Sequence, residues 1–291
     1  MIKVKMIKDS VAPSKIRLST MLLTYPRVVH AEFMTHRVFS RNSASSRAIP
    51  VVKMIDQVEK NPYVPNVFYE NQKGMQGGDP LPKDIQIVLR NLWLDSKNLA
   101  VMQARKMLEY KAAKQHINRI LEPYFHISVV VTSTHWANFF ALRHHPDADP
   151  EIQSLAAEMY KVYSESKPKF LKKGEWHLPF VDFDRPEECL TPDILNEFLL
   201  KCSAARCART SYLNHDGNKI SLKEDLDLYS RLVDRFPVHS SPTEHQAQAT
   251  DDPKIISGNF HGWLQHRKLI PNENVSMHNH VNDNEYIICE I

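Results

Sequence analysis

Residues 30–47 read His-Ala-Glu-Phe-Met-Thr-His-Arg-Val-Phe-Ser-Arg-Asn-Ser-Ala-Ser-Ser-Arg. The stretch holds three arginines, two histidines, an asparagine and four serines, and it contains no glycine. Arginine makes planar, bidentate, charge-assisted hydrogen bonds with phosphate, and hydroxyl and amide groups can fill the remaining acceptor sites. A polar helix end or a solvated loop is the other interpretation of such a cluster. The mixture of groups predicts a site for a phosphate-bearing ligand.

The composition around this stretch is that of a water-soluble globular protein of one large or two modest domains. The chain has 291 residues, 42% hydrophobic and 24% charged, with a formal net charge of +3. So small a charge does not argue for a nucleic-acid partner, but it is compatible with small anionic ligands. Neither a Gly-x-Gly-x-x-Gly nor a Gly-x-x-x-x-Gly-Lys run occurs, so a Rossmann unit and a P-loop are not expected.

Other classes of protein find no support in the sequence. No apolar run is long enough to span a membrane, and the N-terminus lacks the apolar region of a signal peptide. The four cysteines form no Cys-x-x-Cys pair, so we expect free thiols and a cytoplasmic protein, or a host-cytoplasmic one if the source is viral. No zinc-like spacing and no Gly-x-Ser-x-Gly elbow occurs, so neither a metal site nor hydrolase chemistry is predicted.

Periodicity and turn residues predict a mixture of strands and helices. The predicted strands are residues 2–8, 19–25, 125–132 and 286–288. The predicted helices are residues 26–37, 50–59, 83–114 (one helix or two), 115–121, 133–142, 150–164, 192–208 and 222–236, with Thr191 and Ser221 as caps of the last two. Residues 40–47 are predicted to be a polar loop and 61–82 a longer one. The irregular segment 166–192 marks a plausible internal boundary.

The pattern His-Arg-x-x-Ser-x-Asn-x-x-Ser-x-Arg at residues 36–47 resembles the signature of the flavin-dependent thymidylate synthases. The family usually places Gln, then two residues, before Arg-His-Arg. Here Glu32 stands for the glutamine and Thr35 for the first arginine. An ionised carboxylate only accepts hydrogen bonds, so Glu32 changes what this position can offer to a base.

A second resemblance begins at Asn118-Arg119-Ile120-Leu121-Glu122-Pro123 and continues at Asn138-Phe139-Phe140-Ala141-Leu142-Arg143. These segments are similar to the family's arginine-then-proline segment and to its later Asn-Phe-Leu-x-Leu-Arg helix. Ordinary helical arginines that satisfy backbone carbonyls are the alternative interpretation. Asp147 and Asp149 stand where the family usually shows His and Gln, so no role is carried over to them.

A third resemblance lies near the C-terminal end, in Ala208-Arg209-Thr210-Ser211-Tyr212 and His239-Ser240-Ser241-Pro242-Thr243-Glu244-His245. In the family the similar blocks come before the arginine motif, so the order here is that of a circular permutation. Nearby chain termini make such a rearrangement tolerable. Gln265-His266-Arg267 faintly repeats the His-Arg motif, either as a degenerate second copy or by accident.

The resemblance implies an α+β fold, with an antiparallel sheet packed against helices, and a homo-oligomer, by analogy a tetramer. It implies two synthase-like regions, residues 1–170 and 171–291, that form one intertwined functional unit. The implied reaction is reductive methylation of dUMP to dTMP, with FAD as cofactor and NADPH and 5,10-methylenetetrahydrofolate as co-substrates. Reduced flavin supplies the hydride, while the protein orients and polarises the reactants.

The resemblance also implies the roles of individual residues. The catalytic residues it implies are His36, Ser45 and Arg143. The nucleotide-binding residues it implies are Glu32, Ser45, Ser46, Arg47, Arg119 and Arg143. The cofactor-binding residues it implies are His36, Arg37, Ser40, Asn42, Asn138, Ser241, Glu244 and His245. Arginines close to the pyrimidine ring would stabilise negative charge that develops on its oxygens.

Three alternatives remain open at this point. Glu32 could adapt the site to dCMP, or the product could be a hydroxymethylated nucleotide. The changes at Glu32 and Thr35 could leave a flavin- or nucleotide-binding protein without catalysis. A nucleic-acid-binding module that uses the Arg/Ser stretch is the third, and the small net charge disfavours it.

Overall fold

The structure is a computed structural model, and it describes residues 2–73, 77–181, 192–210, 221–235, 237–271 and 273–274. Its centre is a five-stranded sheet with the order β3-β4-β2-β1-β5. The strands are β1 (Lys3–Val11), β2 (Arg17–Pro26), β3 (Ser40–Ser43), β4 (His126–Ser133) and β5 (Lys169–Phe170). All pairings are antiparallel except that of β1 with the short β5.

Two smaller sheets come from the later part of the chain. One has the order β10-β7-β6 and the other pairs β8 with β9. Their strands are β6 (Trp176–His177), β7 (Ala247–Ala249), β8 (Ile256–Ser257), β9 (Phe260–His261) and β10 (Trp263–Gln265). Trp263 and Phe260 are fully buried in a small core with Leu18 of β2, so this region packs directly on the central sheet.

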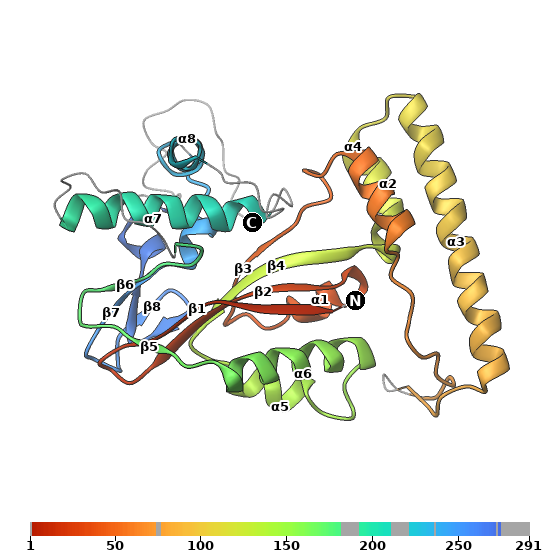
Figure 1. Ribbon diagram of the computed structural model, residues 1–291, viewed down its shortest axis with the longest axis horizontal. Helices are drawn as coiled ribbons and strands as arrows, with labels where there is room; N and C mark the ends of the chain where they lie inside the picture. The colour runs from red at the N-terminus through yellow and green to blue at the C-terminus, as the bar shows by residue number, and fades with distance from the viewer. Residues whose placement is uncertain are drawn as a thin grey trace, which may run out of the picture.

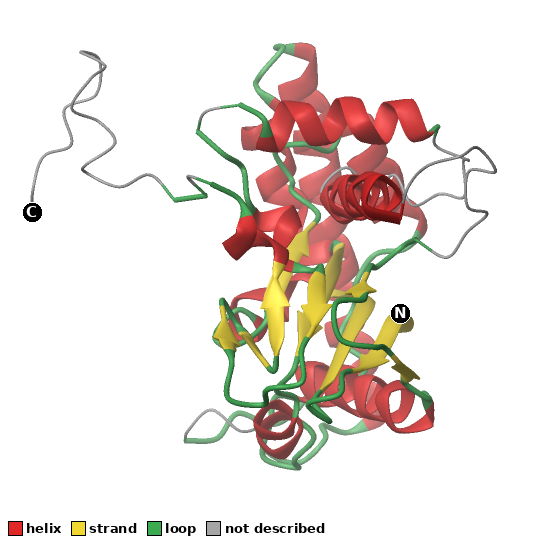
Figure 2. Cartoon of the chain, turned by 90° about the vertical axis from the view of Figure 1, so that its left-hand side faces the viewer, coloured by secondary structure: helices red, strands yellow, loops and turns green. Residues whose placement is uncertain are grey.

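Helices surround the strands. The α-helices are α1 (His30–Phe33), α2 (Val51–Lys60), α3 (Lys83–Glu109), α4 (Lys114–Ile117), α5 (Ala137–Arg143), α6 (Pro150–Glu165), α7 (Pro192–Arg209) and α8 (Leu222–Val233). The 3-10 helices that matter below are η1 (Arg27–Val29), η2 (Asn118–Tyr124), η4 (Ser241–Glu244) and η5 (His266–Leu269). Figure 1 shows α5 and α6 on one side of the central sheet, α7 and α8 on the other, and α3 at the outer edge. Figure 2 shows the strands between these groups of helices.

The two faces of the central sheet differ in chemistry because side chains alternate along each strand. Met21, Leu23 and Tyr25 of β2 point into the main apolar core. Thr20 points to the opposite face, where it lies against Thr132 of β4, its register partner. This second face is buried but polar, and it is covered by the later part of the chain. Asn42 of β3 lies on this face and lines the candidate site.

Helices α7 and α8 are joined by a buried ion cluster. The carboxylate of Asp225, which is fully buried, accepts a hydrogen bond at 2.8 Å from Arg206 Nε and bonds at 3.1 and 3.0 Å from Arg209 Nε and Nη2. A buried carboxylate needs such paired donors to offset its desolvation. The cluster fixes α7, and with it Ala208, against α8.

Long helix α3 leaves an apolar stripe uncovered. Val101 and Ala104 are its buried residues. Its exposed apolar side chains include Ile85, Val88, Leu92, Leu99 and Met102, which follow three-, four- and seven-residue steps along one side of the helix. In the described part of the chain, these side chains stay exposed to solvent.

The predicted mixture of antiparallel strands and helices is confirmed, and residues 83–109 form one helix. The predicted loop at residues 40–47 is wrong in its first half, because Ser40–Ser43 forms β3 and pairs with β4. No described helix is long and apolar enough to span a membrane. Cys202 and Cys207 are free thiols, as predicted. Thr191 as a cap and the strand at residues 286–288 lie outside the described residues, as do Ser211, Tyr212, Cys189 and Cys289.

Candidate functional site

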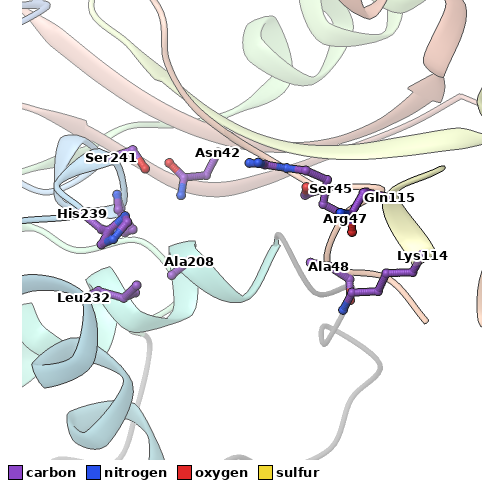
Figure 3. Close-up of a pocket in the computed structure, with 11 residues that line it drawn as sticks. Asn42, Ser45, Arg47, Ala48, Lys114, Gln115, Ala208, Leu232, His239 and Ser241 are labelled. Atoms are coloured by element: carbon purple, nitrogen blue, oxygen red, sulfur yellow. The ribbon is translucent and has the colours of Figure 1, made fainter. Parts of the chain in front are cut away.

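A cleft of about 690 Å³ lies beside the end of β3. Its lining residues are Asn42, Ser45, Arg47, Ala48, Lys114, Gln115, Ala208, Leu232, His239, Ser241 and Pro242. They come from the β3 end, α4, α7, α8 and η4, and Figure 3 shows most of them facing a common space. Its size lies within the range of pockets that hold small molecules and cofactors.

The local structure explains how the opening stretch reaches this cleft. Strand β3 pairs with β4 through Ser40↔Thr132 and Asn42↔Val130, so Ser40 and Asn42 share the polar face of the sheet. The chain then turns after Ser43, and the amides of Ala48 and Ile49 donate to Ser45 O at 2.9 and 3.1 Å. This turn presents Ser45 and Arg47 to the cleft.

Two blocks that are far apart in the sequence meet here. Element η4 packs against β3, and the carbonyl oxygen of Ser241 lies 3.1 Å from the side-chain amide of Asn42. The predicted site residues Asn42, Ser45, Arg47 and Ser241 therefore line one cavity. The order of the blocks along the chain differs from that of the family, yet the fold places them side by side.

The cleft is electropositive. Arg47 and Lys114 line it, and its described lining includes no carboxylate. Lys114 is exposed and donates to Ala48 O at 3.3 Å, which holds α4 against the turn that carries Arg47. Guanidinium and ammonium groups next to the Ser45 hydroxyl suit the phosphate of a nucleotide or of a dinucleotide cofactor.

A second polar cluster joins α1 to α5. Arg143 Nε donates to His36 Nε2 at 3.1 Å, and Arg143 Nη1 forms an ion pair with Glu32. Burial, then the charges of Arg143 and Arg41, lowers the pKa of His36, so its ring is neutral near pH 7. The predicted residues Glu32, His36 and Arg143 thus form one constellation, and none of them lines the 690 Å³ cleft.

The two residues that depart from the family pattern, Glu32 and Thr35, both make polar contacts within the protein. Glu32 holds Arg143 by an ion pair, which a neutral glutamine could not provide. The hydroxyl of Thr35 donates to Glu32 O at 2.7 Å and closes the end of α1. Arg41 Nη1 donates to Met34 O at 2.9 Å and to His36 O at 3.0 Å, which fixes the same turn from β3.

Arg119 lies apart from both clusters. It is exposed on η2 and lines a separate cavity of about 340 Å³ with Arg27, His30 and Glu122. Its predicted contact with a nucleotide phosphate stays a prediction. The Ser46 backbone is held against the start of η2, because Asn118 Nδ2 donates to the Ser46 backbone oxygen at 2.7 Å.

The remaining residues of the third block are engaged within the protein. Glu244 forms an ion pair with Arg267, which also contacts Glu273 at 2.6 Å. His245 is fully buried, with Nδ1 2.8 Å from Thr132 Oγ1. Their predicted flavin contacts stay predictions.

The faint second His-Arg motif is a support for the third block. Gln265 Nε2 donates to Ser40 Oγ at 3.2 Å and to Glu244 O at 3.1 Å. His266 Nε2 lies 3.2 Å from the hydroxyl of Tyr229 on α8. The segment 265–267 therefore connects η4, β3 and α8. Its hydrogen bond from Gln265 holds the buried Ser40 in place.

Some predicted residues lie outside the cleft, and some lining residues were missed. Arg37 and Asn138 are exposed, on the turn after α1 and on α5 respectively. Lys114, Gln115 and His239 line the cleft and were not among the predicted site residues. His239 stands within the quoted third block, two residues before Ser241, and that spacing was the available signal. Lys114 reaches the cleft only through tertiary packing.

In the described part of the chain, no group of three or more metal-ligating side chains is gathered.

Comparisons with known proteins place the chain in a family. A family model described as thymidylate synthase complementing protein matches residues 16–169, which is more than half of the chain. A search of curated proteins found no match.

Among solved structures, the UMP/dUMP methylase PolB from Streptomyces cacaoi, bound with 5-Br UMP, is 16% identical. Its TM-score is 0.49, and the match covers 57% of this chain and 89% of that one. Thymidylate synthase X from Helicobacter pylori with FAD and dUMP is 14% identical with a TM-score of 0.37, over 51% of this chain and 69% of that one. The family assignment rests on the family model, and the chain belongs to the family of the thymidylate synthase complementing protein.

Proposed function

We propose that the protein is a flavin-dependent thymidylate synthase that converts dUMP to dTMP. The observation that carries the proposal is the cleft, in which Asn42, Ser45 and Arg47 of the opening motif face Ser241 of the third block. Membership of the family supports it. The division into residues 1–170 and 171–291 is compatible with one functional unit, because the cleft takes residues from both regions.

The donor set of the cleft fits FAD and a nucleotide. Arg47, Lys114 and Ser45 offer charged and neutral donors for phosphate oxygens. When bound, the flavin would supply the hydride, while methylenetetrahydrofolate supplies the carbon and NADPH regenerates the reduced cofactor. The proton on C5 of the pyrimidine leaves as the methyl group is installed. Arg143, held by Glu32 and next to the neutral His36, would stabilise charge on the pyrimidine oxygens.

We further propose that the active enzyme is a homo-oligomer. Arg119, the Glu32–His36–Arg143 cluster and the cleft occupy different places in one chain. Association of copies would allow these places to complete one another. The apolar stripe of α3 (Ile85, Val88, Leu92, Leu99 and Met102) supports this proposal, because stripes of this kind usually mark protein–protein contacts.

The double substitution Leu92→Glu/Leu99→Glu is expected to convert the oligomer into the 33.7 kDa monomer. Both side chains are more than half exposed, so the charges would cost little in a monomer but would be buried in an interface. Light scattering coupled to gel filtration measures the mass. The matched control is Ile256→Glu on β8, where the side chain is 68% exposed, and it should leave the mass unchanged. A wild-type protein that is itself monomeric would contradict the proposal.

Two measurements test the proposed activity. The purified protein should bind FAD, seen as a flavin absorption band, and should release tritium from C5-labelled dUMP only when methylenetetrahydrofolate and NADPH are present. Mass spectrometry of the product separates a methyl from a hydroxymethyl group. A protein that takes up no FAD contradicts the proposal, and release from labelled dCMP but not from dUMP would replace the proposed substrate.

A further inference from the structure

A continuous chain of buried hydrogen bonds crosses the polar face of the central sheet and ends at the cleft. Its members, in spatial order, are Ser10, His177, Thr20, Thr132, His245 and Asn42. The successive polar atoms lie 2.9, 2.9, 2.7, 2.8 and 3.2 Å apart. The first five residues are fully buried and Asn42 is 6% exposed. Only Asn42 lines the cleft.

The surroundings of Asn42 decide which end of its amide faces the cleft. The carbonyl oxygens of Arg41 and Ser241 lie 3.0 and 3.1 Å from one end of the amide, and His245 Nε2 lies 3.2 Å from the same end. Carbonyl oxygens only accept hydrogen bonds, so the amide nitrogen must stand there. Figure 3 draws the oxygen towards Ser241, and a half-turn of the amide exchanges the two ends. The oxygen then faces into the cleft.

This orientation of the Asn42 amide fixes which group donates and which accepts in every hydrogen bond from Asn42 to Ser10. Because the Asn42 nitrogen donates to His245 Nε2, the His245 proton is on Nδ1 and is donated to Thr132. Thr132 donates to Thr20, and Thr20 donates to His177 Nε2. His177 Nδ1 then donates to Ser10. Reversing Asn42 would leave two carbonyls facing an oxygen and would require every member to change its donor at once.

Both histidines of the hydrogen-bond chain, His245 and His177, are suited to carry a single ring proton. Burial lowers the pKa of His245 to about 3 and lowers that of His177 well below its ordinary value. Neutral imidazole has one donor and one acceptor nitrogen, which gives the chain a single direction. Two charged rings at these places would have no acceptor to offer.

We propose that His245 is a positioning residue that holds the Asn42 oxygen towards the cleft, and that this oxygen accepts the N–H of a cyclic imide. Uracil and the flavin ring both contain this group. The proposal rests on the proposed function and sharpens it, because it names the group that the cleft recognises. With uracil at Asn42, a fixed acceptor favours uracil over cytosine, whose N3 carries no proton. His245 acts through Asn42 and does not touch the ligand.

Methylation of the imide nitrogen tests the proposal on the wild-type protein. Dissociation constants are measured for dUMP against N3-methyl-dUMP, and for FAD against N3-methyl-FAD. For one of the two pairs, methylation should weaken binding about tenfold or more, since it removes a hydrogen bond and leaves the Asn42 oxygen unpaired. The pair that responds identifies the ring that stands at Asn42.

Three variants separate positioning from simple packing. Asn42→Leu should reduce the ratio of the two dissociation constants to about one, because the acceptor is gone. His245→Leu should lower the ratio several-fold, because it removes one of the three acceptors around the amide nitrogen and leaves only the carbonyls of Arg41 and Ser241 to hold it. His266→Leu is the matched control: His266 is also a buried histidine, but it is outside the chain and should keep the wild-type ratio.

A spectroscopic measurement needs neither a variant nor a ligand. Long-range ¹H–¹⁵N correlation spectra of the histidine rings should show the His245 proton on Nδ1. A proton on Nε2, or equal binding of the methylated and unmethylated forms of both rings, would overturn the proposal while leaving the proposed function intact. A protein that binds neither dUMP nor FAD would instead refute the proposed function. The tautomer of His245 would still decide the orientation of Asn42.

Discussion

Arg47→Ala is expected to raise the dissociation constant for dUMP about 100-fold and to abolish measurable turnover. The guanidinium lines the cleft without a carboxylate among the described lining residues, so it is available to a phosphate. Loss of two charge-assisted hydrogen bonds costs about 3 kcal/mol, which corresponds to roughly 100-fold in affinity. Equilibrium binding of dUMP and tritium release from C5-labelled dUMP measure the two effects.

Lys173→Ala provides the control, since Lys173 is an exposed cation that pairs with Asp251 away from the cleft. It should bind dUMP and turn over as the wild type does. Arg143→Ala is expected to lose turnover as well, because it removes the cation that Glu32 and His36 hold in place. Near-normal turnover in both arginine variants would refute the assignment of the site.

The sequence allowed most of the elements and part of the site to be predicted, because these depend on local patterns. The strand at residues 125–132 and the helix at 150–164 agree with β4 and α6 to within a residue at each end. The signature at residues 36–47 led directly to Asn42, Ser45 and Arg47 in the cleft. The strand and the helix follow from hydrophobic periodicity, whereas the site residues follow from the resemblance of this signature to that of the family.

What could not be predicted depends on tertiary contacts. Ser40–Ser43 is polar and reads as a loop, but it forms β3 because the face it joins, with Thr132 and His245, is itself polar. Lys114 enters the cleft because η2 and the turn after β3 bring α4 there. The partner of Glu32, Arg143, is more than a hundred residues away in the sequence. No local pattern records such neighbours.

The buried histidines lead to the last expectation, a large loss of stability as the pH falls from 7.5 to 5. Burial lowers the pKa of His245 to about 3 and that of His266 to about 4, whereas both titrate near 6.5 when unfolded. Between these values the unfolded chain binds more protons, so stability falls with falling pH. Each of the two contributes about 2 kcal/mol by pH 5. His177 acts in the same direction.

Most carboxyl groups titrate below the pH range from 7.5 to 5, so they contribute little to the expected loss of stability. Lys173 lowers the pKa of Asp251 below 3.8, so the stabilisation by that pair is lost only at lower pH. Among the described carboxyl groups, Glu151 is the one whose pKa burial raises, and it opposes the histidines. Urea unfolding at pH 7.5 and 5.0 measures the free energy of unfolding at each pH.

The substitution His245→Gln should reduce the difference in stability between pH 7.5 and pH 5.0 by about 2 kcal/mol, although it lowers stability at pH 7.5. His144→Gln, on an exposed residue, should leave the difference unchanged. Equal pH dependence in the wild type and in His245→Gln would show that His245 takes up its proton in the folded protein at the same pH as in the unfolded chain. A protonated ring cannot accept from the Asn42 amide, so the same measurement bears on the hydrogen-bond chain that ends in the cleft.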